Sequence, residues 1–486
     1  MSISSSSSVG STLTPSSYPN QGLIVMGTGP ESGINYTAIL NALDKALSAP
    51  ITMMQAQETP LNNQLSAWQA IGSDISTLSS SAAALGQPSL FQSYTATSSD
   101  TSVAATQASS SAVPGTYYLS VTALATQGVV ASQGVTATST AVGTGTFSIT
   151  VNGKQTNINI TSSNDTLAGL AQAINNSSSA AGVTASIINN GSSSDPYQLL
   201  LTANNTGTNY TPSVTDGLSG GTALTFSTTQ TAQNAALSFE GINIASQSNT
   251  VKNVIPGVTL SLGSTGSTTI TVGLDTNTID NAVNSFISAY NKVIGDVSSQ
   301  NTVTSSGSGN TKSETLGPLG GNVSLTNLVT NLNSFIGGEA NGLTGNAGLA
   351  STYGITQSSS GSGKLQLNTT ELNNMLTSDP QQVQQFFSSL VNGSPTSDGA
   401  SFPGSLTNFL KTYTNPANGV IQFSEQDIND QITAMNNQIS LQQALVQDQM
   451  GMYTKQFSSL ESYIGQMQTT NSAMTSSIKQ MIAQGA

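Results

Sequence analysis

The sequence predicts a multidomain α+β protein. Its terminal helices would form a coiled-coil stalk and a helical leg, with nested β-rich head domains between them. Apolar residues near both ends of the 486-residue chain recur at alternating steps of three and four, the spacing of a coiled-coil helix. The middle of the chain alternates apolar and polar residues, as half-buried strands do. Helical spacing returns at Thr278.

The C-terminal stretch carries the longest apolar stripe, which starts at Ile428 and is reset by a one-residue skip at Met450. No proline follows Pro416 to break this helix. So narrow a stripe needs a partner helix, and a helix predicted over residues 61–85 has the matching spacing. We expect partner or self-assembly contacts at Leu61, Leu65, Trp68, Ile75, Leu78, Met450, Tyr453, Phe457, Leu460, Ile464, Met467, Met474 and Ile478.

Two interpretations of these terminal stripes stay open. The helices can pair within one chain as a hairpin in the resting protein. The C-terminal helix can instead dock into a polymer of other subunits. Both can hold, each in a different state of the protein.

The N-terminal part begins with a Ser-, Thr-, Gly- and Pro-rich tail over residues 1–33, which we expect to be disordered. A short amphipathic helix is predicted from Ile34 to Leu47, with an interruption at Pro50. The helix over residues 61–85 then ends at Gly86 and Pro88.

The middle of the chain is predicted to be rich in strands, and Asn152-Gly153 is a strong hairpin-turn signal. Asp165 is expected to cap a helix over residues 166–175. Strands are predicted within residues 101–132, 146–160, 183–201 and 234–275. Later helices are predicted at 279–294, 322–336, 369–377 and 381–390, and loops at 301–315 and 391–405.

This order of elements predicts a nested domain plan. Five parts follow: a tail at 1–33; terminal coiled-coil helices at 34–60 and 429–486; a helical leg domain at 61–96 and 276–428; a β-rich head domain at 97–132 and 232–275; and an inserted α+β head domain at 133–231.

The composition excludes several classes of function. Charged residues make up 6% of the chain, against about 25% in an average globular domain. With a net charge of −13 and no cluster of basic residues, the chain is a poor candidate for binding nucleic acid. Without Cys or His it lacks disulfides, thiolate chemistry, the usual general base and the commonest metal ligands. We therefore predict neither an enzyme nor a cofactor site.

Targeting signals are also absent from the sequence pattern. Residues 1–22 lack a basic start, and the apolar run at 23–26 is too short for a signal peptide or a membrane span. We therefore expect a chain that stays inside the cell or leaves it without a cleaved signal.

Two short motifs have simpler interpretations than a binding site. Gly27-Thr28-Gly29 follows no predicted strand and precedes no Lys-Ser/Thr pair, so a flexible tail is favoured over a phosphate loop. Asp275, Asn277 and Asp280 lack the Gly and the distal Glu of a calcium loop, so a solvated turn is favoured over a metal or catalytic site.

Several stretches, in order along the chain, resemble the bacterial flagellar filament cap family, FliD, also called hook-associated protein two. Residues 33–51 resemble its N-terminal helix, and 457–461 (FSSLE) resemble a motif near its C-terminus. The intervening matches are 114–125 (PGTYYLSVTALA), the IN motif at 166–175 with 182–185 (GVTA), 249–251 (NTV), 255–260 (IPGVTL) and 286–291 (FISAYN).

The resemblance implies a structural cap at the distal tip of the flagellar filament. Flagellin would be its partner, with junction proteins of the hook and filament taking part during assembly. The cap would be a homo-oligomeric ring, commonly a pentamer but variable between members. The chain would be exported by the flagellar type III route to the outside of the cell, and it would promote folding and insertion of flagellin at the growing end. The inserted head domain would carry the IN motif.

An extracellular adhesin, binding host or surface ligands through its β-rich head, is the alternative. Ser/Thr-rich strands on a coiled stalk fit that function too, although an adhesin more often shows a signal peptide or an anchor.

The charge content also suggests a working environment. Protonating all 22 Asp and Glu residues leaves only nine Lys charges, so acid generates little repulsion. Our hypothesis is that the protein works outside an acid-living cell.

Overall fold

The computed structural model describes residues 33–306, 313–340, 343, 345–359, 361–393 and 405–484. The predicted tail lies outside the described residues except for Gly33, as does most of the predicted loop at 391–405. The chain divides into two compact units. The first unit contains the residues up to 77, 292–330 and those from 410 onward, and the second contains 78–291 and 331–409.

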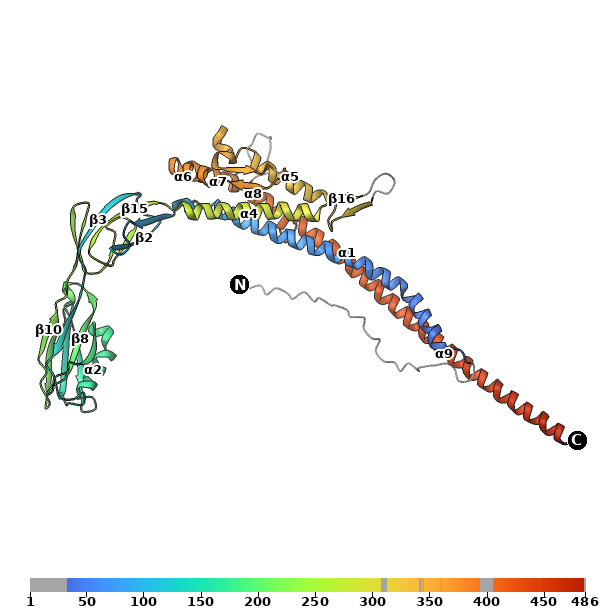
Figure 1. The fold of residues 1–486 in the computed structure, drawn as a ribbon, viewed down its shortest axis with the longest axis horizontal. Helices are drawn as coiled ribbons and strands as arrows, with labels where there is room; N and C mark the ends of the chain where they lie inside the picture. The colour runs from blue at the N-terminus through green and yellow to red at the C-terminus, as the bar shows by residue number, and fades with distance from the viewer. Residues whose placement is uncertain are drawn as a thin grey trace. The chain divides into compact units, whose positions relative to one another are not determined.

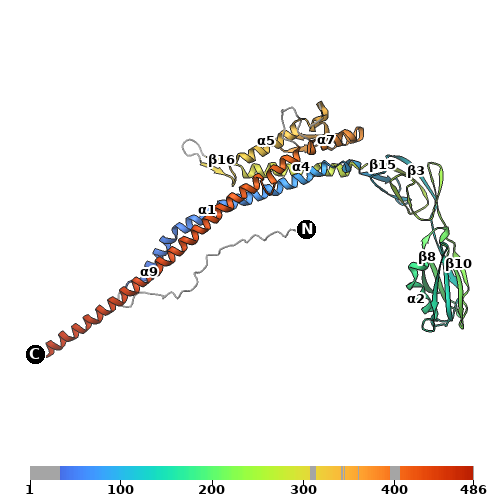
Figure 2. The same cartoon turned by 180° about the vertical axis from the view of Figure 1, so that it is seen from behind.

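The first unit is dominated by two long helices, α1 (Tyr36–Leu85) and α9 (Val420–Gln484), which lie side by side in Figures 1 and 2. The interruption predicted at Pro50 is wrong, because α1 continues through Pro50 and Pro60. Both prolines are exposed, so water can hydrate the carbonyl groups that lose their helical partners. The helix ends at Leu85, before Gly86 and Pro88, as predicted.

A small hairpin, β16 (Val303–Ser306) and β17 (Ser313–Leu316), belongs to the first unit. The sequence predicted only a loop here. The prediction failed because Ser and Gly dominate this stretch, and the short strands show no clear alternation.

The β-rich head in the second unit is built from two antiparallel sheets with the order β1-β15-β3-β11-β12 and β13-β14-β2. Leu119, Leu237, Leu260 and Ile270 are among the buried residues of their shared core. The strands are β1 (Tyr94–Ser98), β2 (Ala104–Ala108), β3 (Gly115–Ala123), β11 (Ala235–Phe239), β12 (Ile242–Ser246), β13 (Thr250–Lys252), β14 (Val258–Leu262) and β15 (Gly266–Leu274).

The inserted region has its own core, around Phe147, Leu170 and Leu201. Its sheets have the order β10-β4-β8-β7 and β6-β5-β9. Its elements are β4 (Gln127–Ser132), β5 (Thr144–Val151), β6 (Lys154–Ile160), α2 (Leu167–Asn176), α3 (Ser178–Ala181), β7 (Val183–Asn189), β8 (Tyr197–Thr206), β9 (Ser213–Ser219) and β10 (Phe226–Gln230).

Two local predictions in this region have different outcomes. The hairpin turn is confirmed, since Asn152 and Gly153 join β5 and β6 with positive φ angles of 50° and 73°. The predicted cap at Asp165 is wrong, because the N-cap of α2 is Thr166, whose hydroxyl accepts a hydrogen bond from the Gly169 N–H at 3.1 Å.

The later helices agree with the sequence except for α8, which was not predicted. Within the second unit, the rings of Tyr353 and Phe386 stack with their centroids 4.2 Å apart. The elements are α4 (Thr276–Gln300), α5 (Val323–Gly337), β18 (Ile355–Gln357), β19 (Leu365–Leu367), α6 (Thr369–Ser378), α7 (Pro380–Asn392) and α8 (Leu406–Thr414). The predicted α+β fold class is confirmed by the long terminal helices and the several antiparallel sheets.

Candidate interaction site on the terminal helices

The centre of the α1/α9 pair is a small apolar core. Ile51 of α1 is buried with Ile439 and Val446 of α9, and Leu47, Met54, Met435 and Met450 pack around them. Ile439 and Val446 belong to the stripe predicted on the C-terminal helix, whereas Ile51 lies beyond the short helix predicted over residues 34–47. Burial of these side chains holds the two helices together.

The N-terminal end of α1 is fixed by Tyr36. Its side chain is only 1% exposed, and its ring centroid lies 5.2 Å from that of Phe457. Its hydroxyl donates a hydrogen bond of 2.8 Å to the Glu461 carboxylate. Tyr36 therefore meets the later part of α9, and the two helices run antiparallel.

The start of α9 faces a later part of α1. Trp68 and Ile428 line a shared cavity of about 400 Å³ together with Leu319. A Cβ at Gly72 would lie 3.3 Å from the Ile421 side chain, so the absence of a side chain at residue 72 allows close approach. The helix at 61–85 is thus the partner of only the first turns of α9, and the stripe beyond Met435 faces α1 before residue 60.

Both stripes contain a local change of period. Leu43, Leu47 and Ile51 are separated by two successive four-residue steps, and so are Gln442, Val446 and Met450. Ile51 and Val446 belong to the same buried cluster, so the two irregular segments meet within this small core. An extra four-residue step in a heptad pattern locally unwinds the supercoil, and matched extra steps let the two helices stay in contact.

The structure does not treat all predicted stripe residues alike. Buried on α1 are Trp68, Ile75 and Leu78. Half-buried are Leu61, Leu65, Met450, Tyr453, Phe457 and Ile464. Exposed are Leu460, Met467, Met474 and Ile478. Leu460 is 43% exposed, whereas the neighbouring Glu461 accepts the hydrogen bond from Tyr36.

The end of α9 is the most exposed apolar surface of the pair. Beyond Met467, every described side chain of this helix is exposed. The large apolar ones are Met467, Met474, Ile478, Met481 and Ile482. This segment is named the α9 tip, residues 465–484, and it offers apolar side chains on successive turns to a partner.

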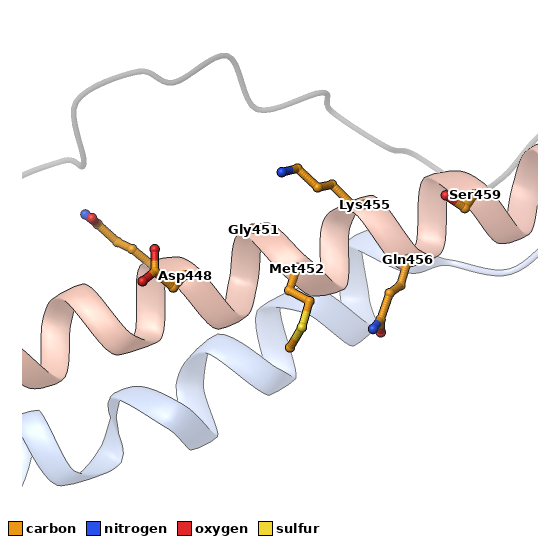
Figure 3. Close-up of a pocket in the computed structure, with 7 residues that line it drawn as sticks. Asp448, Gly451, Met452, Lys455, Gln456 and Ser459 are labelled. Carbon is orange, nitrogen blue, oxygen red and sulfur yellow. The ribbon is translucent and has the colours of Figure 1, made fainter.

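A pocket of about 700 Å³, largely open to solvent, lies beside α9 before the tip. Figure 3 shows Asp448 and Lys455 on one side of the helix and Met452 and Gln456 on the other. Gly451, which has no side chain, also lines this pocket. The lining is polar except for Met452, so it suits a contact made mainly through polar groups. These lining residues form no acid–base pair suited to catalysis.

Other kinds of site find no support in the described residues. No group of three or more Asp or Glu side chains there is placed to hold a metal ion. Among the helices of the described ranges, none combines the length and apolar character that a membrane span requires.

One polar cluster was missed by the sequence reasoning. Asp74 of α1 bonds Lys292 of α4, which also bonds Asp296. The spacing of Lys292 and Asp296, four residues apart in a helix, was the available signal. Asp74 is the sole charged residue between positions 59 and 99, which was a second signal.

Comparison with known proteins identifies the family. The model of the flagellar hook-associated protein 2 N-terminus matches residues 32–128, and that of its C-terminus matches residues 232–469. The chain belongs to the flagellar hook-associated protein 2 family. A third model, of the flagellin hook IN motif, matches residues 146–205, where the sequence showed that motif.

Individual hook-associated proteins match over most of the chain. The flagellar hook-associated protein 2 of Escherichia coli K12 is 28% identical over 93% of this chain and 97% of its own length. The A-type protein of Pseudomonas aeruginosa is 27% identical with the same coverage.

A solved structure agrees with the fold. The crystal structure of the flagellar cap protein FliD D1-D2-D3 domains from Escherichia coli is 26% identical, with a TM-score of 0.55. The match covers 75% of this chain and 99% of that one.

Family membership confirms the expected resemblance and the expectation that the chain is no enzyme, because the relatives are structural flagellar proteins. It supports a location on the flagellum. It does not favour the adhesin alternative.

Proposed function

We propose that this hook-associated protein caps the distal tip of the bacterial flagellar filament. The observation that carries the proposal is the exposure of the apolar side chains of the α9 tip. Met474 is 61% exposed and Met481 is 66% exposed. Apolar residues at this spacing on a helix are suited to burial against another helix. Family membership and the similarity to a solved flagellar cap structure support the same function.

The mechanism is mechanical. The α9 tip docks against flagellin subunits at the growing end, and its apolar side chains become buried there. The head domains then cover the space in which each new flagellin subunit folds and inserts. Contact with flagellin would order the exposed α9 tip, so that binding and ordering of this helix occur together.

The same proposal includes assembly and export. Several copies of the chain form a ring at the filament tip, and the resemblance implies that such a ring commonly has five copies. Junction proteins of the hook and filament take part during assembly. Export by the flagellar type III route fits a chain without Cys, because no disulfide has to open or form.

The nested domain plan remains part of the proposal. Its boundary near residue 133 is better placed near 127, because β4 pairs with β8 and β10 of the inserted region. With that change, the inserted head domain spans residues 127–231.

The test compares the full chain with a version that lacks residues 465–486 in the source bacterium, from which the native copy has been deleted. We expect the shortened chain to be exported but to restore little swimming. Light scattering of the purified proteins shows whether a discrete oligomer of the full chain falls to a monomer on truncation.

A double substitution sharpens this test. Met474→Ser with Ile478→Ser removes two apolar contacts while leaving the tip helix in place. Thr475→Ser with Lys479→Ser changes the adjacent polar positions on the same turns and is the matched control. Full swimming with the Met474/Ile478 variant, or with the shortened chain, would contradict docking through the α9 tip.

A further inference from the structure

Three charged side chains form a cluster between α1 and α4 in the first unit. The Lys292 ammonium lies 3.1 Å from Oδ1 and 3.2 Å from Oδ2 of Asp74. It also lies 2.7 Å from Oδ2 of Asp296 on its own helix. The Asp74 side chain is only 8% exposed, whereas Lys292 is 59% exposed, so the cluster has one buried and two solvated members.

Two carboxylates sharing one ammonium leave one negative charge in excess. No other charged residue of α1 lies between positions 59 and 85. The neighbouring loop 317–322 and the start of α5 have none either. From α9, Glu425 lines a cavity with Ser73 and Ser76, and burial raises the pKa of its carboxyl. Lys292 is therefore the sole positive partner that the described residues place against Asp74.

The surroundings move the pKa values of the two carboxyl groups apart. Burial, and then the hydrogen bond with Asp296, raise the pKa of Asp74 above its ordinary value. The hydrogen bond from Lys292, followed by the one from Asp74, lowers the pKa of Asp296. Asp74 is therefore the carboxyl group that accepts a proton first, and it then donates a hydrogen bond to the ionised Asp296.

We propose that Asp74, Lys292 and Asp296 form a proton-dependent clasp, which holds α4 against α1 more tightly as the medium becomes acidic. The added proton comes from solvent and stays on Asp74. The cluster then carries no net charge, which reduces the cost of burying it. The proposal stands on the geometry of the cluster and is independent of the capping function.

The direction of the effect follows from proton linkage. Asp74 binds its proton more tightly in the folded chain, so its contribution is fully present below the ordinary carboxyl pKa of 3.8 and is lost as pH rises through its raised value. The contribution of Asp296 is present above 3.8 and is lost as pH falls through its lowered value. Both contributions are largely present near pH 3.8, between the lowered pKa of Asp296 and the raised pKa of Asp74, so the clasp is strongest there.

The chain carries its own probe for this region. Trp68 is the single Trp of the sequence, it is buried, and it lies in α1 six residues before Asp74. Urea unfolding of the full chain, followed by Trp fluorescence, therefore reports on the first unit. The midpoint is measured for the wild type and for Asp74→Asn from about pH 7 to about pH 3, the range that covers carboxyl titration.

We expect the wild-type midpoint to rise relative to that of Asp74→Asn as pH falls toward about 4, because Asn cannot take up the proton. On an Asp296→Asn background this relative rise should shrink, since the acceptor of the clasp is missing. Asp430→Asn, at an exposed position of α9, controls for the loss of any one carboxylate.

A constant difference between the wild type and Asp74→Asn across this range would overturn the proposal. So would an Asp430→Asn control that changes with pH as Asp74→Asn does. If Asp74→Asn does not fold, Lys292→Gln replaces it. The urea midpoints of the wild type and of Lys292→Gln should then depend differently on pH, and equal pH dependence would overturn the proposal.

Discussion

The side-chain amide of Asn291 forms hydrogen bonds with both the backbone carbonyl and the backbone N–H of Leu365. The Asn291 side-chain NH₂ donates to the Leu365 carbonyl at 2.9 Å, and the Leu365 N–H donates to the Asn291 side-chain oxygen at 2.7 Å. The same paired bonds join Asn175 to Ala185 and Asn249 to Ala125. Each of these Asn residues belongs to a motif by which the family was recognised. An amide has the donor and acceptor that one residue of a neighbouring strand would offer.

Asn291→Asp should therefore destabilise the second unit. The carboxylate cannot donate to the Leu365 carbonyl, which leaves a buried acceptor without its partner and costs about 1–3 kcal/mol in unfolding free energy. Urea unfolding at neutral pH, followed by far-UV circular dichroism, measures the loss. Asn429→Asp, at an exposed position of α9, is the matched control. Equal midpoints for the two variants would mean that the paired hydrogen bonds contribute nothing net.

Tyr36→Phe tests the polar contact that fixes the N-terminal end of α1. The change removes the hydroxyl that donates to Glu461 but keeps the ring beside Phe457. We expect a loss of about 1–2 kcal/mol, because a hydrogen bond to a charged group is lost from a partly solvated site. Hydrogen exchange of the first turns of α1 should speed up correspondingly.

The control for this variant is Tyr463→Phe, because Tyr463 lies two residues from Glu461 on α9 and is 60% exposed. It should leave both stability and exchange unchanged. The same exchange rates for Tyr36→Phe and wild type would show that ring packing alone fixes this end of the pair.

The sequence was sufficient for the elements whose pattern is local and strong. The stripes from Ile428 and from Leu61 predicted α9 and the second half of α1. Asn152-Gly153 predicted a hairpin turn because both residues accept positive φ angles. The motif residues predicted the family because their order along the chain is preserved.

The features that sequence reasoning missed depend on contacts distant in the chain. Pro50 was expected to break a helix, but packing of Ile51 against α9 keeps the helix continuous. The pairing of α9 with residues before 60 depends on the antiparallel arrangement, which helical spacing alone does not encode.

Ile51→Ala and Val446→Ala test whether the centre of the pair is energetically coupled. Each truncation leaves a cavity in the small core, so we expect Ile51→Ala to cost about 2–4 kcal/mol. The double variant should cost less than the two single effects added together, because both remove the same contact. Met53→Ala is the control, since Met53 is 65% exposed. Full additivity, measured by Trp68 fluorescence during urea unfolding, would indicate that the two residues do not share a contact.

Asp100→Ala should change how the stability of the β-rich head depends on pH. The Asp100 carboxylate accepts hydrogen bonds from the Ser102 hydroxyl at 2.6 Å and the Ser102 N–H at 3.0 Å, and these bonds lower its pKa. Its contribution to stability is therefore present above the ordinary pKa of 3.8 and is lost as pH falls through the lowered value. Urea unfolding is followed by circular dichroism. The midpoint of Asp100→Ala should lie below the wild-type midpoint at neutral pH, and the difference between the two midpoints should become smaller in acid. Asp195→Ala, which removes a carboxylate at an exposed loop position, is the control. A difference between the wild-type and Asp100→Ala midpoints that stays constant into strong acid would contradict a role for the ionised carboxylate.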